Sequence, residues 1–141
     1  MEKFTWSKAL ETGVPSIDNQ HRELIYAFND LSEAIESGTG ATAIKKLLTF
    51  LKYYAEWHFD SEEKCAARHQ CPIAATNQAA HKKFLQILTD LQIEYRHSAD
   101  GDTVARKAHQ ELSQWLMGHI LKIDTQIGHC INTTQAASSA N

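Results

Sequence analysis

Apolar residues recur at steps of three and four along almost the whole chain, which is the period of an amphipathic helix. Glycine and proline separate four such stripes, and no segment shows the alternation by two that indicates a β-strand. The pattern predicts helices over residues 18–37, 41–67, 73–97 and 103–129. Asp18 is expected to cap the first helix, and Pro72 suits the start of the third because a first helical turn leaves N–H groups unpaired anyway.

Helices of this length joined by short loops pack as antiparallel neighbours, so the sequence predicts an all-α, up-down-up-down four-helix bundle. Residues 1–16 contain Phe4 and Trp6 without any period and are expected to form an N-terminal arm across one end of the bundle. Residues 132–141 are small and polar, with little to bury, and are expected to be a frayed tail. Residues 1–131 would then form a single domain, which suits a chain of 141 residues.

Composition excludes several classes of function. Apolar residues make up 43% of the chain and charged residues 22%, as in ordinary globular proteins. The formal net charge of -3 leaves no basic stripe for nucleic acid or anionic lipid. No run resembles a secretory signal or is apolar enough to span a membrane. The sequence therefore predicts a cytoplasmic protein that neither binds nucleic acid nor inserts into a membrane.

The three cysteines, Cys65, Cys71 and Cys130, are odd in number and lack the C-x-x-C spacing of a zinc knuckle. Reduced thiols are therefore expected. Cys65 follows Glu62 by three residues and should face inward, as apolar filling.

Ionisable side chains interrupt all four apolar stripes. They are His21 in the first stripe, His58 and Glu62 in the second, His81 in the third, and His119 and Asp124 in the fourth. Burying a carboxylate without a partner costs several kcal/mol, and no Lys or Arg lies on these stripes near the two carboxylates. A metal would supply the missing positive charge, and the chain's 8 histidines, more than average usage predicts, point the same way.

Spacing places these side chains on shared faces. His58 and Glu62 are four residues apart and therefore lie one turn apart on one side of their helix. Asn77 and His81 have the same spacing. The interval of five between His119 and Asp124 is an offset of about 140° on a regular helix. Asp124 nevertheless continues the row of Leu116, Ile120 and Ile127 and is expected to face the same cavity.

Two carboxylates on opposed helices, Glu62 and Asp124, suit a pair of cations that both acids bridge, with imidazoles at the outer positions. A structural zinc site needs only four ligands and more often uses thiolate, whereas an imidazole-carboxylate shell suits iron, manganese or zinc. A ferritin-like centre requires two Glu-x-x-His pairs, and only the stretch from Glu94 to His97 fits. A shell richer in histidine than in carboxylate also favours reversible binding over cleavage of an O–O bond.

Four ordered elements of the sequence resemble the hemerythrin family, specifically its bacterial single-domain members, the bacteriohemerythrins. They are the stretch from Gly13 to His21, the H-F-x-x-E-E element from His58 to Glu63, Pro72 followed by His81-Lys82-Lys83-Phe84, and the W-L-x-x-H-x-x-x-x-D ending from Trp115 to Asp124. Together they cover nearly the whole chain.

The resemblance implies two non-haem iron ions, bridged by Glu62 and Asp124, and dioxygen as the ligand. By the same resemblance His21 and His58 would bind the iron with the open oxygen site, and His81 and His119 would bind the other iron. The oxygen pocket would be lined by Leu24, Phe59, Trp115, Leu116 and Ile120. These five are equally well explained as ordinary core residues of the stripes.

One position departs from the family pattern. The first of two histidines in the third element falls on Asn77, whose amide oxygen is a weak iron ligand; water or an empty position is the alternative. His69, near Pro72, is expected to be a loop residue rather than a substitute. The remaining histidines are expected to be solvated: His97, His109 and His129.

The residues and the resemblance together predict a di-iron protein that reversibly binds dioxygen, for carriage, storage or delivery, rather than an enzyme. The alternative is a di-iron redox enzyme, or a sensor of oxygen or nitric oxide, with an iron site altered at Asn77. The sequence leaves the protein partner, the oxygen affinity and the oligomeric state open.

Overall fold

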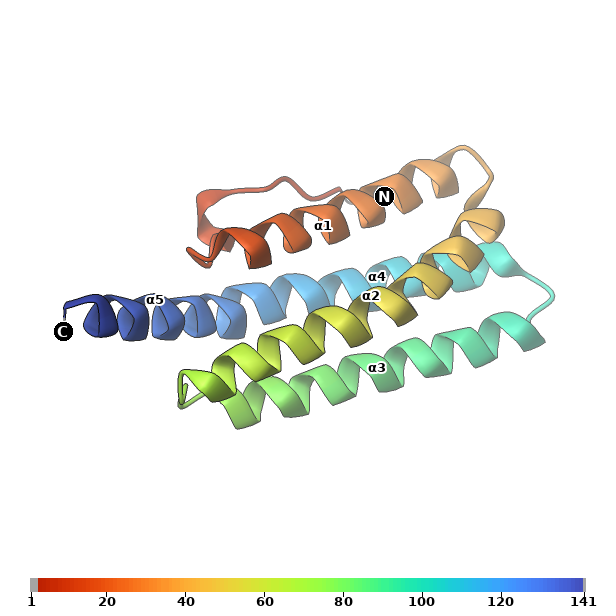
Figure 1. Cartoon of the computed structure of the whole chain (residues 1–141). Coiled ribbons are helices and arrows are strands. Elements are labelled where there is room, and N and C mark those ends of the chain that lie inside the picture. Colours follow the sequence, from red (N-terminus) through yellow and green to blue (C-terminus); the bar gives the residue numbers. More distant parts are fainter. Residues whose placement is uncertain (1–2, 141) are drawn as a thin grey trace.

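Four long helices lie side by side in the computed structural model (Figure 1), which describes the backbone of residues 3–140 and the side chains of residues 3–134. The helices are α1 (Pro15–Glu36), α2 (Gly40–Arg68), α3 (Ala74–His97) and α4 (Gly101–His119). A single π-helical turn, η2 (Ile120–Asp124), joins α4 to α5 (Thr125–Ala140), which continues in the same direction. Successive long helices run in opposite directions, and the described residues contain no strand. The predicted antiparallel four-helix bundle is confirmed.

The start of α1 differs from the prediction. Pro15 occupies its first turn and Val14 precedes it, so Asp18 is not the N-cap. The Asp18 carboxylate instead accepts hydrogen bonds from the backbone N–H and the hydroxyl of Thr12, both at 2.8 Å. Asp18 therefore fastens the preceding segment to the first turn of the helix.

The N-terminal arm, with its short helix η1 (Lys8–Leu10), runs along the bundle and not across its end (Figure 1). Phe4 exchanges two hydrogen bonds of 2.8 Å with the side chain of Asn29, well along α1. The expected position was wrong because Phe4 finds an apolar site between α1 and α4, with its ring 6.1 Å from that of His109. Residues 1–2 of the predicted arm lie outside the described residues.

His109 was expected to be solvated, and this is also wrong. Its side chain is buried beneath the arm, 2.7 Å from the hydroxyl of Ser32, with the ring of Phe28 beside it. The polar pair between α1 and α4 satisfies the imidazole inside the core. His97 and His129 are exposed, as predicted.

The cysteines also depart from the prediction, because Cys71 and Cys130 form a disulfide. Cys71 lies in the connection between α2 and α3, and Cys130 lies on α5. The two are 59 residues apart, so no local spacing reveals the pair. Cys65 is the free cysteine of the described residues and packs, half-buried, beside the apolar cluster at this end.

The segment from Asn132, expected to be a frayed tail, continues α5 as helix as far as Ala140. The Asn132 side chain donates a hydrogen bond of 3.1 Å to the carbonyl of Gly13. A Cβ at the neighbouring Gly128 would lie 2.0 Å from the carbonyl oxygen of Thr12, so only glycine allows α5 to approach the arm this closely. Residue 141 lies outside the described residues.

Candidate metal centre

A polar layer separates two apolar clusters inside the bundle. The larger cluster reaches Leu24 on α1, Phe59 on α2 and Ile120 on η2. The smaller cluster lies at the disulfide end of the bundle. It includes Ile17 on α1, Ala66 on α2 and Ile127 on α5. The predicted site residues fall in the interval between the clusters, and the bundle therefore holds them at one level.

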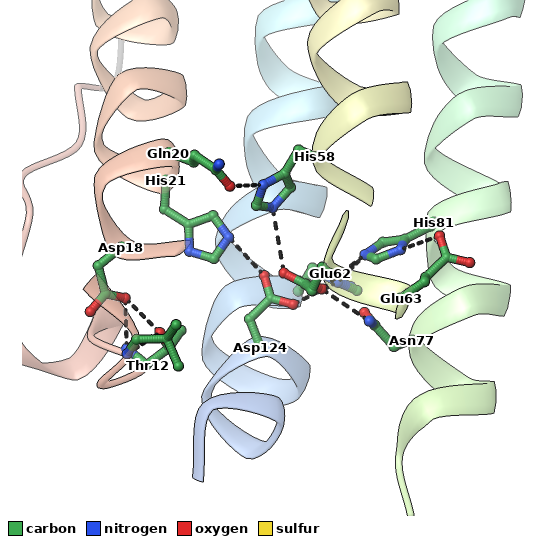
Figure 2. Close-up of polar contacts among 12 residues, drawn as sticks. Thr12, Asp18, Gln20, His21, His58, Glu62, Glu63, Asn77, His81 and Asp124 are labelled. Atoms are coloured by element: carbon green, nitrogen blue, oxygen red, sulfur yellow. Dashed lines mark hydrogen bonds and ion pairs between the residues drawn. The ribbon is translucent and has the colours of Figure 1, made fainter. Parts of the chain in front are cut away.

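All of the predicted metal-binding side chains are buried, none more than 5% exposed: His21, His58, Glu62, Asn77, His81, His119 and Asp124. Figure 2 shows Glu62 and Asp124 in the middle of the layer, with His21 and His58 on one side and His81 and Asn77 on the other. The structure thus brings together the whole set that the sequence singled out.

Each carboxylate offers one oxygen to each side of the layer. Glu62 places Oε2 3.4 Å from Nε2 of His58 and Oε1 3.3 Å from Nε2 of His81. Asp124 places Oδ2 3.0 Å from Nε2 of His21 and Oδ1 3.1 Å from Nε2 of His119. Two groups of possible ligands result, each with its atoms within 4.8 Å of one another. Glu62 belongs to both groups, which is the arrangement that two neighbouring cations require.

The π-helical turn η2 brings Asp124 beside His119. The backbone N–H of Thr125 bonds to the carbonyl of Ile120, five residues earlier instead of the usual four. This wider turn carries Asp124 round to the side of His119, so the two side chains come within 3.1 Å despite their interval of five. The sequence predicted the shared cavity but not the π turn that produces it.

Two further residues orient the histidines and were missed by the sequence analysis. His58 donates its Nδ1–H to the amide oxygen of Gln20, and His81 donates its Nδ1–H to Glu63 at 3.1 Å. With Nδ1 held in this way, Nε2 of each imidazole is free to bind a metal. A signal existed in both cases, because Gln20 and Glu63 directly adjoin the predicted ligands His21 and Glu62.

Several buried polar atoms of the layer have no hydrogen-bond partner among the described residues. They include Oε2 of Glu62 and Oδ1 of Asp124, each near a histidine but without hydrogen-bond geometry. A buried carboxylate oxygen left in this state costs free energy that a bound cation recovers. Imidazole and carboxylate are donors that iron, manganese and zinc accept. The residues present therefore fit a metal centre.

Protonation of the metal-free layer follows from the same contacts. Burial alone would raise the pKa of Glu62, but its close contacts with the imidazoles of His58 and His81 hold it well below its ordinary value. Burial alone would lower the pKa of His81, but its hydrogen bonds to Glu62 and Glu63 raise it. These shifts favour an ionised Glu62 and a protonated His81, and the attraction between the two charges offsets part of the cost of burying them.

Asn77 lies in the layer beside Glu62. Its side chain is fully buried and donates from Nδ2 to Oε1 of Glu62 at 3.0 Å, while Oδ1 has no hydrogen-bond partner in the part of the chain described. His69, in contrast, is the C-cap of α2 and donates to the carbonyl of Cys65 at 2.8 Å. His69 therefore has a local role at the end of the helix.

A narrow, enclosed cavity opens onto the layer beside His21, His58 and His119. Its free volume of about 10 Å³ is close to the minimum that holds one water-sized molecule. Four of the five residues expected at the oxygen pocket line it: Leu24, Phe59, Trp115 and Leu116. Ile120 is buried in the neighbouring core but is not among the lining residues. Phe28, Leu51 and Tyr54 contribute further walls that the sequence analysis did not name.

Comparison with known proteins agrees with this geometry. The family model of the hemerythrin HHE cation binding domain matches residues 12–129. The bacteriohemerythrin of Methylococcus capsulatus is 29% identical over 94% of this chain and 99% of its own length. That of Clostridium acetobutylicum is 27% identical over 87% of this chain and 97% of its own length. A crystal structure of wild-type hemerythrin, 28% identical, matches with a TM-score of 0.75 over 91% of this chain and 97% of the other. Since the family match spans the bundle and every residue of its polar layer, the chain belongs to the hemerythrin family.

Proposed function

We propose that the protein holds two non-haem iron ions in the polar layer and binds dioxygen reversibly beside them. The observation that carries the proposal is that each of two buried carboxylates lies between two histidines, one on each side of the layer. The name bacteriohemerythrin, which the matched relatives carry, also supports the proposal.

In this proposal Glu62 and Asp124 would be ligands to both irons. His21 and His58 would hold one iron, and His81 and His119 would hold the other. Gln20 and Glu63 fix the orientation of His58 and His81 through their Nδ1 atoms. Ferrous iron supplies the electrons that dioxygen needs in order to bind. The protein's own task is to position the ligands and to control what reaches them.

The walls of the cavity favour reversible binding over reaction. Leu24, Phe28, Leu51, Phe59 and Leu116 are apolar and leave little room for water. The nearby hydroxyl of Tyr54 is engaged as a donor to the carbonyl of Gln20 at 2.6 Å, and burial raises the pKa of this phenol. Tyr54 is therefore a poor proton donor toward dioxygen in the cavity, which favours release of dioxygen unchanged, as carriage, storage or delivery requires.

The second candidate, a redox enzyme or a sensor of oxygen or nitric oxide, is favoured by Asn77. Where the family pattern has a histidine, this amide donates to Glu62, so one iron would have one imidazole fewer. Such an iron has a position open to water or to a second small molecule.

Metal analysis and absorption spectroscopy test the proposal. The purified protein should contain about two irons per chain, as a doubly bridged centre requires. The reduced protein should show an absorption band that appears with oxygen and disappears under vacuum. One zinc and no iron would overturn the di-iron proposal, whereas rapid irreversible oxidation in air would favour the enzyme or sensor.

Dioxygen is the partner that this proposal requires. Among the described residues no helix is long and apolar enough to cross a membrane. A cytoplasmic location stays a prediction. The Cys71–Cys130 disulfide argues against it, because cytosolic thiols keep most cysteines reduced.

A further inference from the structure

The outer face of α2 carries an exposed aromatic stripe, which consists of Phe50, Tyr53 and Trp57. α2 packs against α1, α3 and α4 (Figure 1), and the stripe residues are 42%, 68% and 59% exposed, respectively. They line a shallow groove formed by α2 alone. Contiguous apolar patches on soluble proteins commonly mark interaction sites.

Charges of opposite sign flank the two ends of the stripe. Lys46 precedes Tyr53 by seven residues and Asp60 follows it by seven, and both side chains are exposed. Seven residues are nearly two helical turns, or about 10.5 Å, so both charges share the face of Tyr53. Asp60 also pairs with Lys64 at 2.8 Å, but such an exposed pair contributes little and leaves the carboxylate accessible.

We propose that this face binds a second copy of the chain, with the two α2 helices antiparallel about a twofold axis at Tyr53. In an isologous interface, residues equally distant from the axis lie opposite one another. Lys46 then faces the partner's Asp60, and Thr49 lies opposite the partner's Trp57. Both ends of the stripe become complementary in charge while the aromatic centre is covered.

The order of the charges along α2, with Lys46 at one end of the stripe and Asp60 at the other, favours a second copy of the chain over other occupants. An acidic partner segment would pair with Lys46 but be repelled by Glu56 and Asp60, and a basic segment would meet the reverse problem. A copy of α2 in antiparallel orientation presents both signs in the required order.

The area suits a weak association. An aromatic side chain has a surface of about 200 Å², so the exposed parts of the stripe offer about 350 Å² in each copy, before the flanking residues are counted. The stripes of two copies together therefore offer about 700 Å², below the lower limit of about 1,200 Å² for a stable interface. We expect a reversible dimer with a dissociation constant in the micromolar range, formed independently of iron or oxygen.

Sedimentation equilibrium of the full, metal-loaded chain from micromolar to sub-millimolar concentration tests the proposal. The wild type should show a monomer-dimer equilibrium. Tyr53→Asp places two carboxylates against each other at the axis and should weaken the dimer at least about a hundredfold. Tyr26→Asp is the matched control, because Tyr26 is 57% exposed on α1 and lies outside the groove. Equal effects of the two substitutions, or a wild type that stays monomeric throughout, would overturn the proposal and leave the stripe to another partner.

A charge exchange tests the antiparallel register. Lys46→Glu and Asp60→Lys should each weaken the dimer about tenfold, because symmetry makes each substitution count twice. The double variant restores the pairing with reversed sign and should return to within about threefold of the wild type. Failure of the double variant to recover would show that Lys46 and Asp60 do not face each other. The helical circular dichroism of every variant should match the wild type, since all these positions are on the surface.

Discussion

At the scale of single residues, Glu62 is the point that both halves of the centre share. Its two oxygens approach His58 at 3.4 Å and His81 at 3.3 Å, and Asn77 donates to the same carboxylate. His58 and His81, in contrast, lie on opposite sides of the layer (Figure 2). Removing the charge of Glu62 should therefore disturb both metal positions together.

Glu62→Ala is expected to lose both metals and to lower the free energy of unfolding of the metal-free protein by about 3 kcal/mol, because two buried imidazoles lose their partner. Metal content per chain and urea unfolding measure the two effects. Glu62→Gln keeps the volume and separates the lost charge from the cavity. Glu111→Ala changes an exposed glutamate of α4 and should alter neither quantity. If Glu62→Ala kept both metals and its unfolding midpoint, the bridging role would be wrong.

Asn77→His is expected to tighten metal retention and to prolong the oxygen-dependent absorption band. Imidazole donates more electron density to iron than a neutral amide does. Oδ1 of Asn77 also has no hydrogen-bond partner among the described residues, so the present side chain leaves a polar atom of the layer unpaired. The rate of iron loss to a chelator and the lifetime of the band measure the effects.

Asn77→Ala is the control for this exchange, because it removes the hydrogen bond to Glu62 without adding a ligand. It should lose iron faster than the wild type. Equal chelation rates and band lifetimes in the wild type and Asn77→His would mean that position 77 is not a ligand position in this protein.

The sequence predicted the metal-binding side chains because they interrupt the apolar stripes. Burying an ionisable group at such a position costs free energy, so each of these residues needed an explanation. Gln20 and Glu63 adjoin predicted ligands in the sequence but do not lie on the apolar stripes, so their burial cost did not single them out. Both are only half-buried at the margin of the core, where polar residues are ordinary. Their roles appear only when α1 is placed beside α2, and α3 beside α2, so that the Nδ1 atoms of His58 and His81 find them.

At the scale of elements, the apolar periodicity predicted the ends of the long helices. It did not predict the segments whose backbone conformation depends on a single local contact. Apolar spacing placed α2 and α3 within one residue of their observed ends. The π-helical turn η2 was not predicted, because it leaves the apolar row of Ile120 and Ile127 nearly unchanged. The helical segment after Asn132 also escaped, since its composition offers little to bury.

The disulfide is the element-scale feature whose energetic effect is easiest to measure. It closes a loop of 59 residues between the α2–α3 connection and α5, and a loop of that length corresponds to about 4 kcal/mol of lost chain entropy in the unfolded state. The double substitution Cys71→Ser with Cys130→Ser should lower the free energy of unfolding by about 2 to 4 kcal/mol in urea titrations.

Reduction of the wild type should have the same effect, and the double variant should not respond to a reductant. Cys65→Ser is the matched control, because it removes the free thiol and leaves the bond in place. An equally stable double variant would mean that the bond adds nothing to the packing of Ile127 and Ile131 at this end.

At the scale of the whole molecule, the bundle consists of two apolar clusters with a charged layer between them. The clusters supply the stability of the fold, and the layer reduces it unless its charges are neutralised. In the metal-free protein the contacts of Glu62 with His58 and His81 provide part of that neutralisation. Metal should therefore add stability to a fold that exists without it.

Removing the metal with a chelator is accordingly expected to lower Tm without unfolding the protein. Free metal at about a hundredfold its dissociation constant contributes about 2.7 kcal/mol, which for a domain of this size is roughly 10 °C in Tm. The circular dichroism spectrum at room temperature should remain helical, because the larger cluster, which includes Leu24, Phe59 and Ile120, contains none of the proposed metal ligands. Thermal melts with and without metal measure the shift, and Glu62→Ala should show none. A metal-free chain that is unfolded would mean that the clusters cannot hold the bundle alone, and an unchanged Tm would mean that the polar layer binds no metal in the folded protein.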